Sequence, residues 1–133
     1  MNKLIFDLNK IFVKPNPVNI IYAYDLLKNF DTNEWKYYTE KPKKGYVKKN
    51  LLLNDNKFKY DLFLYSWCPH TVNNEKFSSM SVYKVLQGNL YQFENSYEGT
   101  LGVKNSVKYI NYANFHSLQT NSFTYSLHIF LKN

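Results

Sequence analysis

The spacing of apolar residues changes once along this chain, and that change sets its fold class. Up to about residue 30, apolar side chains recur three and four positions apart, whereas from about residue 45 they alternate with polar ones. The first period is typical of helices that bury one face, and the second of half-buried strands. We therefore expect a mainly β protein, with two or three short N-terminal helices before an antiparallel β-barrel or jelly roll.

The helical part is predicted over residues 1–40. Residues 3–13 and 18–30 each have the apolar spacing of an amphipathic helix, and two prolines between them end the first. A helical turn is expected at residues 34–38. The pattern indicates that both helices cover a core and carry no motif of their own.

The β part is predicted over residues 45–133. A loop containing Gly99 and Gly102 is expected to interrupt it. The predicted strands are 46–53, 60–67, 79–86, 90–93, 106–112, 115–118 and 123–132. With 133 residues, and no internal repeat or linker, the chain is expected to form one domain over residues 1–133.

Charge and cysteine content narrow the partners and the compartment. The net charge is +7, and every basic residue is lysine, most densely between residues 40 and 49. Proteins that read base edges favour arginine forks, so nucleic acid is disfavoured as a partner. No apolar run approaches the ~20 residues that span a bilayer, which predicts no membrane partner. A lone Cys68 and the lack of a signal core predict a cytoplasmic protein.

Several segments together carry a family resemblance that covers nearly the whole chain. They are Asp31-Thr-Asn-Glu-Trp35, Tyr46-Val-Lys-Lys49-Asn-Leu51, Leu64-Tyr-Ser-Trp67, Tyr83-Lys-Val-Leu-Gln-Gly88, Val107-Lys-Tyr-Ile-Asn111 with Phe115-His116, and Ser126-Leu-His128-Ile-Phe130. In order and spacing they resemble the motifs of the cysteine dioxygenase family of cupins. The resemblance implies a cupin-type barrel, here in a divergent and C-terminally truncated member whose interior is more open.

The family oxidises the thiol of free L-cysteine to a sulfinate with O₂, using Fe(II) held by three histidines. By this resemblance the third histidine is His116, and the His-x-His pair falls at Asn74 and Lys76. Neither residue replaces an imidazole on iron. The resemblance therefore implies a degenerate, non-catalytic relative that holds no metal.

Two alternatives stay open. His70, Glu75 and His116 would supply the two histidines and one carboxylate that suit non-haem iron. With Fe(II) at that relocated site, the chain would be an active thiol dioxygenase acting on cysteine. The second alternative is an interaction protein that works through its basic surface.

The resemblance also assigns residues around the metal. Ser126 and His128 match the family's catalytic serine and histidine, and their i, i+2 spacing places them on one face of a strand. Lys49 stands where the family has the arginine that binds the substrate carboxylate, and Tyr46 belongs to the same substrate-binding segment.

The family's cysteine–tyrosine thioether cannot form in this chain. Its two positions correspond to Ser81 and Phe130, neither of which can supply the crosslink.

The sequence gives no oligomeric state.

Overall fold

The fold is described from a computed structural model. It describes residues 1–14, 16–55, 59–76, 80–94, 99–110 and 115–131, of which 54–55, 75–76 and 115–116 are described by their backbone alone. The helices are α1 (Asn2–Ile11), α2 (Asn19–Lys28) and the 3-10 helix η1 (Glu34–Tyr38). The strands are β1 (Val47–Asp55), β2 (Tyr60–Trp67), β3 (Thr71–Lys76), β4 (Ser81–Gln87), β5 (Leu90–Glu94), β6 (Gly99–Gly102), β7 (Val107–Ile110), β8 (Phe115–Thr120) and β9 (Thr124–Leu131).

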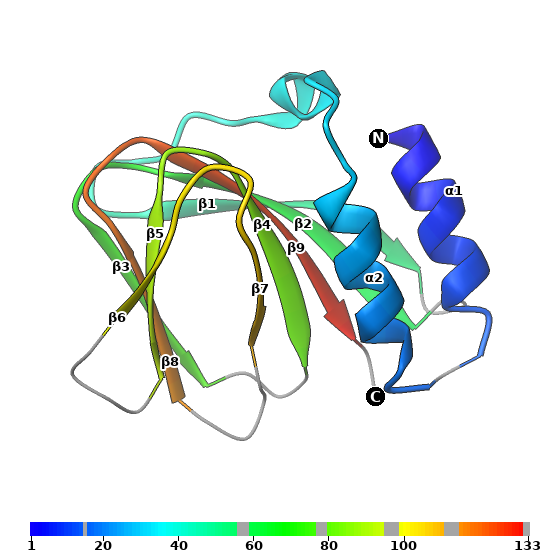
Figure 1. Ribbon diagram of the computed structural model, residues 1–133. Helices are drawn as coiled ribbons and strands as arrows, with labels where there is room; N and C mark the ends of the chain where they lie inside the picture. The colour runs from blue at the N-terminus through cyan, green and yellow to red at the C-terminus, as the bar shows by residue number, and fades with distance from the viewer. Residues whose placement is uncertain (15, 56–58, 77–79, 95–98, 111–114, 132–133) are drawn as a thin grey trace.

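The strands form two antiparallel sheets that face each other (Figure 1). The five-stranded sheet has the order β1-β2-β9-β4-β7, and the four-stranded sheet has the order β3-β8-β5-β6. Within the described ranges no strand pairing joins one sheet to the other. The mainly β fold is confirmed. The described strands form two facing sheets rather than the expected closed barrel.

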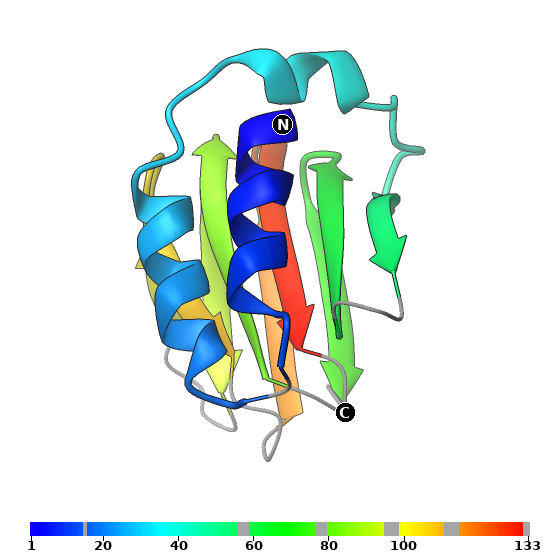
Figure 2. The same cartoon turned by 90° about the vertical axis from the view of Figure 1, so that its right-hand side faces the viewer.

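The five-stranded sheet is buried on both faces, which is why β4 is buried at nearly every position. On its outer face, Leu64 and Ile129 pack with helical residues such as Leu8 and Leu27 in one core cluster. Helices α1 and α2 lie side by side across that face (Figure 2). The inner face carries a second cluster that includes side chains of the four-stranded sheet, and this cluster surrounds the candidate site.

Lys84 fixes the C-terminal end of α2 to the sheet. Its side chain is buried, and its ammonium donates hydrogen bonds to the carbonyl oxygens of Lys28 and Phe30 at the end of α2. These carbonyls have no partner within the helix, so the lysine satisfies them. Burial lowers the pKa of Lys84, while the nearby Asp31 carboxylate acts in the opposite direction.

The structure differs from the sequence prediction at β6. A loop was expected around Gly99 and Gly102, but both glycines belong to a short edge strand paired with β5. A Cβ on Gly99 would lie 2.6 Å from the ring of Phe93. Glycine lowers strand propensity, but here it lets the edge strand pass over an aromatic ring, and that packing outweighs the propensity.

The helices are short. In the ranges given above, none is long and apolar enough to cross a membrane.

Candidate functional site

A hydrogen-bonded chain of three buried side chains lies on the inner face of the five-stranded sheet. Trp67 Nε1–H donates to Ser126 Oγ at 2.9 Å, and Ser126 Oγ lies 2.7 Å from His128 Nε2. Neither Ser126 nor His128 has any exposed surface. The strand pairing of β2 with β9 brings Trp67 to this face, where it lies diagonally across from Ser126. The structure therefore brings together the two residues that the resemblance assigned as catalytic.

The ring of His128 is enclosed by tyrosines from both neighbouring strands. Its centroid lies 4.0 Å from the Tyr65 ring on β2 and 5.0 Å from the Tyr83 ring on β4, and both ring pairs are nearly parallel. Tyr83 in turn donates its hydroxyl hydrogen to Gln92 Oε1 at 2.7 Å, across the gap between the sheets. Burial raises the pKa of both tyrosines, so they stay neutral. Histidine 128 is thus packed as part of a core.

The environment holds His128 in its neutral form. Burial lowers its pKa from 6.5 to about 3, and the positive charge of Lys49 acts in the same direction. In the Nε2–H tautomer, His128 would donate to Ser126, and both the serine hydroxyl hydrogen and His128 Nδ1 would lack partners. In the Nδ1–H tautomer, the Ser126 hydroxyl donates to Nε2, and only the hydrogen on Nδ1 lacks a partner. The second arrangement satisfies more buried groups, so we assign His128 the Nδ1–H tautomer.

Several buried polar atoms have no hydrogen-bond partner among the described residues, and His128 Nδ1, Ser81 Oγ and Lys108 Nζ are among them. Ser81 is fully buried and lies directly opposite Phe130 in the pairing of β4 with β9. An unpaired buried donor is costly, so these atoms mark where the packed interior lacks hydrogen-bond partners.

Of the two predicted substrate-binding residues, Lys49 lies at the rim of the site and Tyr46 does not. Lys49 is opposite Tyr65 in the pairing of β1 with β2, and its ammonium lies 5.3 Å from the centroid of that ring. Burial of part of its side chain lowers the pKa of Lys49. Tyr46 is exposed, before the start of β1, and its described contact is a backbone hydrogen bond to Lys43. The structure therefore brings Lys49 to the site but leaves Tyr46 outside it.

Strand β3 separates the residues of the predicted metal sites. Asn74 is exposed, whereas Thr71 on the same strand is buried, so Asn74 does not point between the sheets. His70 is exposed in the turn before β3 with φ of 60°, and Glu75 lies five residues further on, about 16 Å along an extended strand.

The backbone of β3 does pair two of those residues. Glu75 is directly opposite His116 on β8, and Lys76 follows at the end of the strand. An intact β3 therefore keeps His70 away from this pair.

The side chains around His128 do not fit an iron ion. Iron in such enzymes needs several imidazole or carboxylate ligands around one point. The neighbours of His128 are instead tyrosine rings, a serine hydroxyl and the Lys49 cation, which would repel a metal ion. Within the described part of the chain, no group of three histidine, cysteine, aspartate or glutamate side chains could hold a metal.

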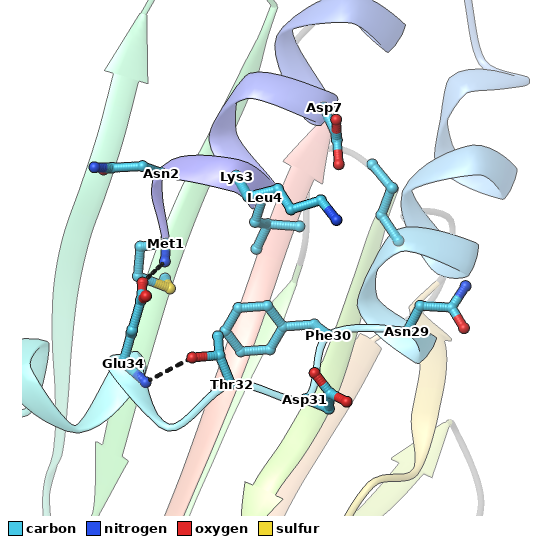
Figure 3. Close-up of a pocket in the computed structure, with 11 residues that line it drawn as sticks. Met1, Asn2, Lys3, Leu4, Asp7, Asn29, Phe30, Asp31, Thr32 and Glu34 are labelled. Carbon is cyan, nitrogen blue, oxygen red and sulfur yellow. Dashed lines mark hydrogen bonds and ion pairs between the residues drawn. The ribbon is translucent and has the colours of Figure 1, made fainter.

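A pocket of about 420 Å³ lies elsewhere, between the N-terminal end of α1, the C-terminal end of α2 and the segment that follows α2 (Figure 3). Its lining combines the apolar Leu4, Leu26 and Phe30 with acidic side chains such as Asp7 and Asp31. It opens on the helical side of the five-stranded sheet, so it is separate from the site around His128.

The comparison with solved structures identifies the fold. A cupin superfamily protein from Desulfitobacterium hafniense superposes with a TM-score of 0.63 at 16% identity, over 71% of this chain and 84% of that one. A protein from Thermus thermophilus superposes with a TM-score of 0.65 at 14% identity, over 77% and 98%. The cupin domain of an XRE-family transcriptional regulator from Enterobacter cloacae gives 0.59 at 13% identity, over 65% and 97%. The chain therefore has a cupin fold.

No family model and no curated protein sequence matches the chain. At these identities the structural likeness establishes the fold and leaves the activity open.

Sequence reasoning missed the aromatic enclosure of His128. The alternation in residues 60–67 did predict that Tyr65 and Trp67 share one face of a strand. Tyr83 reaches the same histidine through the pairing of β4 with β9, which local sequence does not determine.

Proposed function

We propose that this chain is a non-catalytic cupin related to the cysteine dioxygenases, in which the two sheets correspond to a cupin-type barrel. Its interior does not support iron-dependent thiol oxidation. The observation that carries this proposal is the buried, neutral His128, held between Tyr65 and Tyr83 and hydrogen-bonded to Ser126.

A general acid or base works best when its pKa lies near the working pH. Since burial and Lys49 lower the pKa of His128 to about 3, its imidazole does not take up a proton near neutral pH. A serine–histidine pair in this state fills the core but does not cycle protons. The replacement of the family's paired histidines at Asn74 and Lys76 supports the same proposal.

The kinship itself is supported by one pair of positions. The family's two crosslinked residues correspond to Ser81 and Phe130, and these lie directly opposite each other on β4 and β9. Opposed side chains on neighbouring strands approach within about 5 Å, the proximity that a crosslink requires. The resemblance and the register therefore agree at these positions.

Iron loading with an oxygen-uptake assay tests the proposal. The protein is loaded anaerobically with Fe(II), desalted, analysed for iron and then assayed for cysteine-dependent O₂ consumption. We expect well under one iron per chain and no oxygen uptake above that of buffer, with L-cysteine recovered unoxidised. Stoichiometric iron that is lost in His116→Ala but kept in His70→Asn, together with sulfinate formation, would overturn the proposal.

The backbone pairing of Glu75 with His116 favours one second candidate, an active thiol dioxygenase with a relocated iron site. In that case both Glu75→Gln and His116→Ala would abolish iron binding and oxygen uptake. If the parent protein binds iron and the His70→Asn variant does not, His70 is a ligand despite its place in the turn.

A further inference from the structure

The stretch from η1 to the start of β1 concentrates the positive charge of the chain. Residues 34–50 contain six lysines and two glutamates, a net charge of +4 in a protein of net charge +7. All six lysines are exposed, and three exposed tyrosines lie among them. We call residues 36–49 the lysine–tyrosine arm. Its exposed lysines and tyrosines are Lys36, Tyr37, Tyr38, Lys41, Lys43, Lys44, Tyr46, Lys48 and Lys49.

The arm is held against the edge of the five-stranded sheet, where β1 is the outermost strand. Asn50 Nδ2–H donates to the Tyr38 carbonyl at 2.7 Å, and the Lys48 ammonium lies 3.4 Å from the Glu40 carboxylate. The thiol of Cys68 lies 3.6 Å from the carbonyl oxygen of Pro42. These contacts fix the arm before any partner binds, which lowers the ordering cost of binding.

We propose that the lysine–tyrosine arm binds single-stranded nucleic acid. Tyr37 is 88% exposed and Tyr46 is 67% exposed, so their rings are open to solvent. Proteins that bind single strands without sequence preference combine such stacking surfaces with cations that neutralise phosphates. Arginine forks serve base-edge reading in duplex grooves, so their absence disfavours duplex recognition and leaves stacking available.

A single strand fits the arm better than a lipid surface. Helices and segments that dock on membranes insert large apolar side chains such as leucine or phenylalanine. The exposed large side chains of the arm are lysines, tyrosines and Glu40, and leucine and phenylalanine are absent from it. Apart from Lys49, which borders the site around His128, the arm lies outside that site. The proposal therefore goes beyond the proposed function and stands independently of it.

Fluorescence anisotropy with a labelled oligothymidine of roughly 20 nucleotides tests the proposal, over salt from about 25 to 200 mM. We expect the single strand to bind more tightly than a duplex of the same length. Tyr37→Ser with Tyr46→Ser should weaken binding about tenfold or more by removing stacking. Lys43→Gln with Lys44→Gln should reduce the slope of log affinity against log salt by about 1.4, or ~0.7 for each lost phosphate contact.

Matched substitutions on the helices provide the controls. Tyr22→Ser changes a tyrosine on α2 that is 55% exposed, and Lys3→Gln with Lys14→Gln removes two exposed lysines outside the arm. These variants should bind like the parent protein, and circular dichroism melts verify that each variant is folded. The proposal is overturned by no binding at about 25 mM salt. Equal affinity for the duplex, unchanged binding in the tyrosine variant, or equally tyrosine-dependent binding to phosphatidylserine vesicles would each overturn it too.

Discussion

When the pH falls from about 6.5 toward 3, we expect the folding equilibrium constant to decrease roughly tenfold for each pH unit. The cause is His128, whose pKa in the fold is about 3 against an ordinary value of 6.5. Between these values the unfolded chain binds a proton that the folded chain excludes. The stability conferred by the neutral imidazole is therefore complete above about pH 6.5 and is lost as the pH falls toward 3.

Urea denaturation of paired variants measures this contribution. His128→Gln keeps an acceptor for Ser126 but cannot titrate, so its stability should change much less between pH 6.5 and 5 than that of the parent. His70→Asn replaces an exposed histidine with a residue that tolerates the positive φ there, and it should keep the parent's pH dependence. Equal slopes for His128→Gln and the parent protein would show that His128 is not the titrating group.

Replacing Gly88 by alanine is expected to reduce the free energy of unfolding by about 3 kcal/mol. Gly88 lies in the turn between β4 and β5 with φ of 80°, a conformation that costs a residue with a side chain about 1–2 kcal/mol. A Cβ there would lie 2.3 Å from Thr124 Oγ1 and 2.5 Å from the Phe123 carbonyl oxygen. Thr124 Oγ1 also accepts from the Asn89 amide at 3.2 Å, so moving it disturbs the contact between two turns.

Gly45 provides the matched control for this substitution. It has nearly the same φ, 81°, but a Cβ there would meet nothing within 4 Å. Gly45→Ala should therefore cost only the backbone term, about 1 kcal/mol. The difference between the two alanine variants, measured by urea denaturation at one pH, isolates the clash with Thr124. Equal losses in both variants would contradict the close packing of the two turns.

The helices and most strands could be predicted from local periodicity. Residues 60–67 form β2 as expected, and the alternation along them divides the two faces of the five-stranded sheet correctly. Local patterns could not show that both faces are buried. That depends on α1 and α2 covering one face and on the four-stranded sheet covering the other.

The candidate site could be predicted in part. Ser126 and His128 were expected on one face of a strand, and they are hydrogen-bonded to each other there. The enclosure of His128 by Tyr65 and Tyr83 depends on the strand order β2-β9-β4, which is a property of the whole sheet. Residue types alone therefore could not show that two tyrosines enclose this histidine.

Strand β3 shows why assigning a strand residue by counting from a distant motif is prone to error. Counting back from Gly88 placed the family's first paired histidine at Asn74, which is exposed. Because side chains alternate along a strand, a shift of one residue moves a position to the opposite face.

Nitrogen chemical shifts of the histidine rings, followed by NMR from pH 8 to pH 4, test the central claim most directly. We predict that one histidine, identified by its loss in His128→Gln, remains the neutral Nδ1–H tautomer throughout, because its pKa lies near 3. Titration of His128 between pH 6 and 7 would contradict the account. Such a titration would make His128 competent for proton transfer at physiological pH and would favour the interpretation of the protein as an enzyme.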